Sequence, residues 1–185
     1  MLEDGEEFGL MVIAPAHHRR IAAGILSWGQ DLDHETSPFQ VNLAYQVPRN
    51  KKSDYIGKAE LERQRDIIDS GDAPFKMKMV GITLGGKEIT DYAPDFWLVA
   101  DTDGNDMGYV TSPWWSPELE TNIALAWVPW SSSEVGTKLL VKLPDEYSVT
   151  PGEPVEGEVV DVPFRESVNP NKREVEAAKG KDFAE

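Results

Sequence analysis

The sequence predicts an α+β protein in which a short α/β segment precedes six antiparallel strands that form a small barrel or sandwich. Helical patterns of useful length occur before residue 71, and from residue 75 short apolar or alternating runs follow one another with Gly, Pro and Asp between them. The chain has 185 residues, 40% of them hydrophobic, which suits one domain or a little more with a packed core.

The first 71 residues contain two predicted helices and one predicted strand. After an acidic start and an apolar stretch at 10–15, Pro15 opens a predicted helix over residues 16–26. Ile21 and Ile25 are four residues apart on one face of it, and Gly24 lies inside it as a residue that weakens its far end. Residues 27–39 are rich in turn formers. Residues 40–47 alternate and predict a strand with its odd-numbered apolar side chains on one face, and residues 57–70 predict a second helix.

The turn formers at 71–74, Gly-Asp-Ala-Pro, are the expected domain boundary. The predicted units are therefore 1–71, 75–164 and a charged tail at 165–185. Asp-Gly within 101–105 predicts a hairpin turn between two of the strands. The six predicted strands are 75–84, 94–100, 106–112, 120–128, 137–143 and 156–162, and the side chains expected inside are Val80, Ile82, Val110, Ile123, Leu125, Val141 and Val159.

Composition restricts the function. With 18 Lys and Arg against 33 Asp and Glu, the formal charge is −15, which argues against nucleic acid or an anionic membrane as a partner but leaves room for a small anionic ligand. No cysteine is present, so thiolate chemistry is excluded, and with three histidines we expect no metal site. The N-terminal residues lack the pattern of a signal peptide, so we expect a cytoplasmic protein.

Three groups of residues are candidates for chemistry. The run from His17 to Arg20 either starts a helix and pairs with acids, or clamps an anion through the guanidinium fork. Asp31 and the acidic residues that follow it either cap turns or form part of a metal loop whose remaining spacing is missing. Trp28, beside a glycine after a helix, and Trp114, near a strand end, could face a planar ligand.

Four blocks, in order along the chain, resemble the aminomethyltransferase (glycine-cleavage T-protein) superfamily. They are RIAAGILSWGQDLDHETSPF at 20–39, YIGKAEL at 55–61, DGNDMGYVTSPWWSPELETNIALAWV at 103–128 and VVDVPF at 159–164. The sequences SWGQD at 27–31 and SPFQ at 37–40 resemble the demethylase-like branch, which includes dimethylsulfoniopropionate demethylase, more than the glycine-cleavage enzymes. The blocks span about residues 16 to 164.

The resemblance implies that 1–71 is the end of a folate-binding body and that 75–164 is the C-terminal barrel, here a six-stranded antiparallel one. It also implies transfer of a methyl or aminomethyl group to tetrahydrofolate as cofactor, with Arg20, Trp28 and Trp114 at the cofactor site. The family's catalytic aspartate belongs to the N-terminal body, outside these blocks, so no catalytic residue is assigned.

Two departures from the family pattern affect the expected site. Ala22 stands where the family has a pterin-binding Glu, so we expect weaker folate binding, and Ala22→Glu should tighten it. Gln40 stands where the family often has Glu.

Three functions remain open at this stage. The chain is a tetrahydrofolate-dependent transferase or the C-terminal portion of one, a non-catalytic barrel module docking on a separate folate-binding chain, or an inactive relative. The implied partners are folate, a small methylated or aminomethyl substrate, and either an N-terminal-half chain or a second copy. We expect association through an apolar surface made by 10–13 and 41–47.

Overall fold

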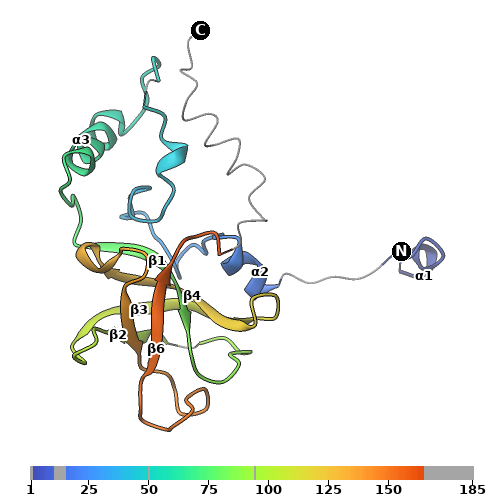
Figure 1. Ribbon diagram of the computed structural model, residues 1–185. Coiled ribbons are helices and arrows are strands. Elements are labelled where there is room, and N and C mark those ends of the chain that lie inside the picture. The colour runs from blue at the N-terminus through green and yellow to red at the C-terminus, as the bar shows by residue number, and fades with distance from the viewer. Residues whose placement is uncertain (1, 11–15, 50, 94, 165–185) are drawn as a thin grey trace.

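The computed structural model describes residues 2–10, 16–49, 51–93 and 95–164. Its central feature is a closed six-stranded barrel whose neighbouring strands are all antiparallel, in the order β1-β4-β3-β2-β5-β6 (Figure 1). The strands are β1 (Met77–Leu84), β2 (Trp97–Ala100), β3 (Asp106–Ser116), β4 (Thr121–Pro129), β5 (Lys138–Val141) and β6 (Val155–Val160). All six predicted strands are present, and the predicted fold class is confirmed.

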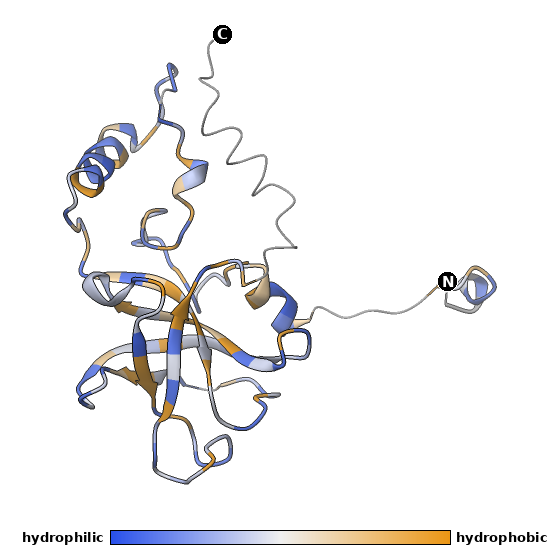
Figure 2. Cartoon of the chain, viewed as in Figure 1, coloured by the Kyte–Doolittle hydropathy of each residue, from blue (hydrophilic) through white to orange (hydrophobic). Residues whose placement is uncertain are grey.

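The barrel interior is filled by aliphatic side chains contributed by every strand. Val80 and Ile82 of β1, Val110 of β3, Val141 of β5 and Val159 of β6 belong to this cluster, as predicted. β-Branched residues suit such half-buried pleated surfaces, because their restricted side chains pack against cross-strand neighbours. Figure 2 shows the apolar colour concentrated on the barrel strands, whereas α3 (Lys58–Asp69) is largely hydrophilic.

The prediction that Ile123 and Leu125 point inward is wrong. Ala124, Ala126 and Val128 face the interior, and Ile123 and Leu125 belong to a second apolar cluster on the outer side of β4. The central residues of β4 are buried on both faces, so alternation of polar and apolar residues gives no signal for the inward face.

The second cluster is covered by α2 (His17–Ala22), which lies against β3 and β4. Ile21 of α2 is fully buried there, together with Met79 and Trp127 from the barrel. The helix ends where Gly24 adopts a φ of +69°, a conformation that glycine takes without steric cost. The predicted helix is therefore present but shorter than the pattern suggested.

The prediction of a strand at 40–47 is wrong. Asn42 has a φ of +61° and interrupts the extended backbone, and the segment continues as the 3₁₀ helix η1 (Ala44–Gln46). One edge of β1 is paired along its whole length with β4, whereas the other edge is paired with β6 only from Gly81 to Leu84. The segment lies against the first half of β1 through separate hydrogen bonds, such as that from the Met79 amide to the Gln40 carbonyl at 2.8 Å.

The second predicted helix is confirmed as α3. It packs on the loop that carries η1, where Ser37 Oγ donates to Gln64 Oε1 at 2.7 Å and the Arg65 guanidinium lies over the Phe39 ring. The remaining short elements are α1 (Leu2–Glu6) and the 3₁₀ helix η2 (Trp130–Ser132). Within the described ranges, no helix has the length and apolar character needed to cross a bilayer.

The predicted apolar surface is only partly present. Val41 and Val47 are buried rather than exposed, although Tyr45 between them is open to solvent. Residues 11–15, and the tail from 165 onward, lie outside the described residues.

Candidate functional site

A tight turn follows α2 and carries Trp28 at its tip. The Asp31 amide donates to the Ser27 carbonyl at 2.8 Å, and the Ser27 amide donates to Asp31 Oδ2 at 2.7 Å, so one residue closes the turn from both sides. Gly29 at the tip has a φ of +80°, which the turn requires. We call residues 27–32 the Trp28 turn.

Asp31 joins this turn to the barrel. Its side chain is fully buried and accepts from Arg20 Nη1 at 2.8 Å, and from Thr111 Oγ1 and Ser112 Oγ at 2.6 Å each. Arg20 Nη2 also donates to Ser112 Oγ at 2.8 Å. A buried carboxylate needs this number of donors, because leaving water without replacement hydrogen bonds is costly. The four side chains Arg20, Asp31, Thr111 and Ser112 form what we call the polar junction.

A β-bulge in β3 makes the junction possible. Val110 pairs with Ala126 and Ser112 pairs with Leu125, so Thr111 is an extra residue on its strand. Successive side chains of a regular strand point to opposite faces, whereas a bulge turns two neighbours to one side. Thr111 and Ser112 therefore both direct their hydroxyls at Asp31.

Two further contacts hold the Trp28 turn on the barrel. Gln30 Nε2 donates to the Thr111 carbonyl at 2.7 Å, and Trp127 Nε1 donates to the Asp31 carbonyl at 3.0 Å. Trp28 itself leaves this framework, with 68% of its surface exposed. Because its turn is held in place and its indole is open to solvent, a face of the ring is accessible to a ligand.

Aromatic rings gather beside the polar junction at the start of α2. The His17 ring lies 4.4 Å from that of Tyr92 and 4.8 Å from that of Trp114, measured between centroids. Arg20 Nε donates to His17 Nδ1 at 3.4 Å. Burial, together with the Arg20 charge, lowers the pKa of His17 from 6.5 to about 4, against a smaller raising effect of Asp31. His17 is therefore neutral at pH 7.

The His17 pKa leads to a stability prediction. Because the pKa is lower in the folded state than in the unfolded chain, the unfolded chain binds more protons between pH 6.5 and 4, and stability falls as pH falls through that window. His17→Phe keeps a packed ring but has no group that titrates. We therefore expect the free energy of unfolding of this variant to fall by about 1–2 kcal/mol less than that of the parent chain as the pH is lowered, allowing for partial exposure of His17. Urea unfolding of both proteins at pH 7 and 4.5 measures it, and identical pH dependence would contradict it.

Comparison with known proteins identifies the barrel. Residues 78–165 match the family model described as "Glycine cleavage T-protein C-terminal barrel domain". The chain is 35% identical over 124 residues to an aminomethyltransferase of Synechococcus sp. (strain CC9902), covering 67% of this chain and 31% of that protein. It is 33% identical over 145 residues to an aminomethyltransferase of Oceanobacillus iheyensis, covering 77% and 36%.

The barrel is a T-protein C-terminal barrel domain. The chain belongs to the aminomethyltransferase superfamily through the C-terminal portion of that family's sequence. It spans about a third of the length of the curated relatives that it matches. The fold agrees with the crystal structure of glycine cleavage system aminomethyltransferase T from Bartonella henselae, with a TM-score of 0.62 at 24% identity, covering 81% of this chain and 38% of that one.

Packing of α2 on the T-protein barrel brings two of the three residues predicted for the cofactor site close together. Arg20 binds Asp31 in the polar junction, and Trp114 contacts His17 beside it. Trp28 is carried by the turn that the junction fixes. Arg20 thus pairs with an acid, which is one of the two interpretations that the sequence allowed. Asp31 and Asp33 accept hydrogen bonds from backbone amides in turns, as capping residues do.

Ala22, at the position of the family's Glu, is 5% exposed and packs in the second cluster of the T-protein barrel. Its carbonyl accepts from the Phe164 amide at 2.9 Å. An added carboxylate would enter an apolar cluster, and this changes the expected effect of Ala22→Glu from tighter folate binding to loss of stability.

The sequence around Thr111 and Ser112 did not predict that these residues bind Asp31. Both lie within the VTSP part of the third resembling block, but hydroxyl residues in a strand have no periodic signal for a bulge. Among the described residues, no group of three or more His, Asp or Glu side chains is placed to hold a metal ion.

Proposed function

We propose that this chain forms the C-terminal portion of a tetrahydrofolate-dependent one-carbon transferase, in which the Trp28 turn forms part of the wall of the folate site. The observation that carries the proposal is the exposed Trp28 ring held on a turn that a buried carboxylate fixes. The likeness to aminomethyltransferases supplies the reaction class, with the transferred group being methyl or aminomethyl.

The residues present fit a flat ring at Trp28 but provide no charged anchor for it. Arg20 is engaged by Asp31 at 2.8 Å, and Ala22 is buried and apolar. The face of Trp114 is partly covered by His17. Bound tetrahydrofolate would supply the nitrogen that accepts the one-carbon unit, and this chain would orient its rings and keep water away.

Proton transfer is not a role that the polar junction suits. The Asp31 carboxylate is saturated by its donors, and the lowered pKa of His17, about 4, makes its ring a weak base at pH 7. These two observations favour a second candidate, in which the barrel is a non-catalytic module that completes a folate site on a separate chain. In both cases the contribution of this chain is binding and positioning.

Calorimetric titration with tetrahydrofolate tests the proposal, using the chain alone and mixed with the N-terminal portion of a matched aminomethyltransferase. Trp28→Ala should weaken binding about 5- to 150-fold, because stacking of a ring on an aromatic side chain is worth about 1–3 kcal/mol. Its stability should be unchanged, since the side chain is 68% exposed.

Tyr45→Ala is the matched control, since Tyr45 is 63% exposed on a different segment and should not alter binding. If Trp28→Ala and Tyr45→Ala bind tetrahydrofolate with equal affinity, Trp28 is not part of the folate site. Binding only in the mixture would favour the docking module, and absence of binding in both experiments would refute the proposed function.

A further inference from the structure

A small pocket lies where β1 and β6 part, at the end of their pairing at Gly81 and Val160, and beside the segment that follows η2. Its volume is about 90 Å³, several times the space that one water molecule needs and far below the roughly 300 Å³ at which pockets for drug-sized ligands begin. Its apolar lining is mostly small, with Val80 and Gly81 from β1 and Val159 and Val160 from β6.

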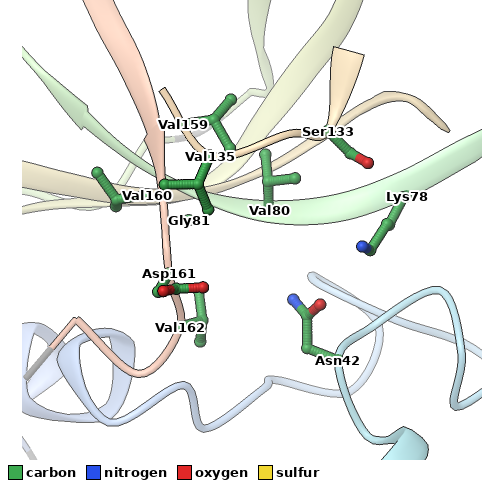
Figure 3. A pocket seen from close by; sticks show the side chains of 10 residues that line it. All are labelled: Asn42, Lys78, Val80, Gly81, Ser133, Val135, Val159, Val160, Asp161 and Val162. Atoms are coloured by element: carbon green, nitrogen blue, oxygen red, sulfur yellow. The ribbon is translucent and has the colours of Figure 1, made fainter. Parts of the chain in front are cut away.

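Opposite charges face each other across this pocket. Figure 3 shows Lys78 and Asp161 extending from opposite sides, with Asn42 of the neighbouring loop between them. Among the ion pairs of the described residues, none joins Lys78 to Asp161. Burial lowers the pKa of Lys78 and the Asp161 charge raises it, so the two groups interact across a gap without closing it.

The positions of the polar atoms are fixed by the surrounding structure. Lys78 Nζ lies 5.1 Å from the centre of the Trp130 ring, which holds the ammonium group beside the pocket. Asn42 Nδ2 donates to the Met79 carbonyl at 3.0 Å, which leaves its side-chain oxygen as an acceptor. Ser133 Oγ donates to the Trp130 carbonyl at 2.8 Å and likewise retains its lone pairs.

This arrangement selects for a ligand that carries both charges. A simple anion at Lys78 would meet the Asp161 carboxylate and the neighbouring acceptor oxygens, and a simple cation at Asp161 would meet the Lys78 ammonium. We propose that the pocket binds a small zwitterion of the size of a free amino acid, with its carboxylate on Lys78 and its ammonium group on Asp161 and the Asn42 oxygen. This site is separate from the polar junction and does not depend on folate.

Titration of the ¹⁵N-labelled full chain with glycine, followed by amide NMR spectra, tests the site. Glycine should shift the amide signals of Gly81 and Asp161 saturably, while acetate and methylammonium, which each carry one of the two charges, should bind at least about tenfold more weakly. Lys78→Met and Asp161→Asn should each weaken glycine binding by about tenfold or more, and unchanged amide dispersion in the same spectra shows that each variant is folded.

Lys76→Met is the matched control, because Lys76 is an exposed lysine two residues before Lys78 and outside the pocket lining. It should leave glycine binding unchanged. Equal binding of acetate and glycine would overturn the proposal in favour of a plain anion site, and absence of saturable shifts at about 100 mM glycine would refute any such site. Because folate affinity should be the same in Lys78→Met, failure here is distinct from failure of the proposed function.

Discussion

Asp31→Ala is expected to lower the free energy of unfolding by about 3–5 kcal/mol, a large share of the 5–15 kcal/mol that stabilises a typical domain. The substitution leaves the Arg20 guanidinium without its carboxylate and removes the acceptor of Thr111, Ser112 and the Ser27 amide. Removing one partner of a buried ion pair costs more than the pair contributes, because the other partner stays buried. Urea unfolding followed by circular dichroism measures the change.

Asp69→Ala provides the comparison. Asp69 also binds an arginine, Arg49, through two hydrogen bonds of 2.6 and 2.9 Å, but both side chains are exposed. Its loss should cost less than about 1 kcal/mol, as for other surface pairs. If the two alanine variants lose the same stability, the polar junction does not hold the Trp28 turn on the barrel.

Ala22→Glu is the second substitution with a large expected effect, a loss of about 3 kcal/mol at pH 7. The new carboxylate would enter the apolar cluster to which Ala22, Ile21 and Met79 belong, where leaving water is costly for a charged group. Part of the loss should be recovered at low pH, where the carboxyl group is neutral. Chemical unfolding at pH 7 and pH 4.5 checks both statements.

The exposed Ala44, substituted by Glu in the same way, should change stability by less than about 0.5 kcal/mol. A stable Ala22→Glu variant that binds tetrahydrofolate more tightly than the parent chain would refute this prediction. It would also mean that α2 can turn its buried face toward a ligand, as the family's Glu at this position implies.

The strands could be predicted from sequence because turn formers separate them and the alternation of apolar side chains is visible in most of them. The inward face of β4 could not be predicted, because its buried residues lie on both faces and the pattern of Ile123 and Leu125 is as apolar as that of Ala124 and Ala126. The error at 40–47 has a different cause. Val41 and Val47 are buried, as an alternating strand would have them, but Asn42 has a φ of +61° and interrupts the extended backbone that a strand needs.

Only those features of the candidate site that depend on neighbouring residues in the sequence could be predicted. Trp28, beside Gly29, was recognisable as an aromatic residue at a turn, and it is exposed there. Asp31 was recognisable as a capping residue, but its contact with Ser112 joins positions that are 81 residues apart. Such a contact depends on how the barrel closes and on which strand α2 covers, and neither is contained in a local pattern.

The bulge at Thr111 also affects how β3 could change in length. The inside-outside alternation up to Val110 and the alternation from Ser112 onward are each regular, and the extra residue lies between them. Loss of one residue at this point would leave Val110 facing the interior and Trp114 facing α2. It would remove the Thr111 hydroxyl that binds Asp31 and the Thr111 carbonyl that accepts from Gln30. The same loss between Ser112 and Ser116 would exchange buried and exposed positions along the rest of the strand. The strand is thus tolerant of a length change at the very place where it contacts the Trp28 turn, so insertions and deletions there can alter the binding surface without disturbing the barrel.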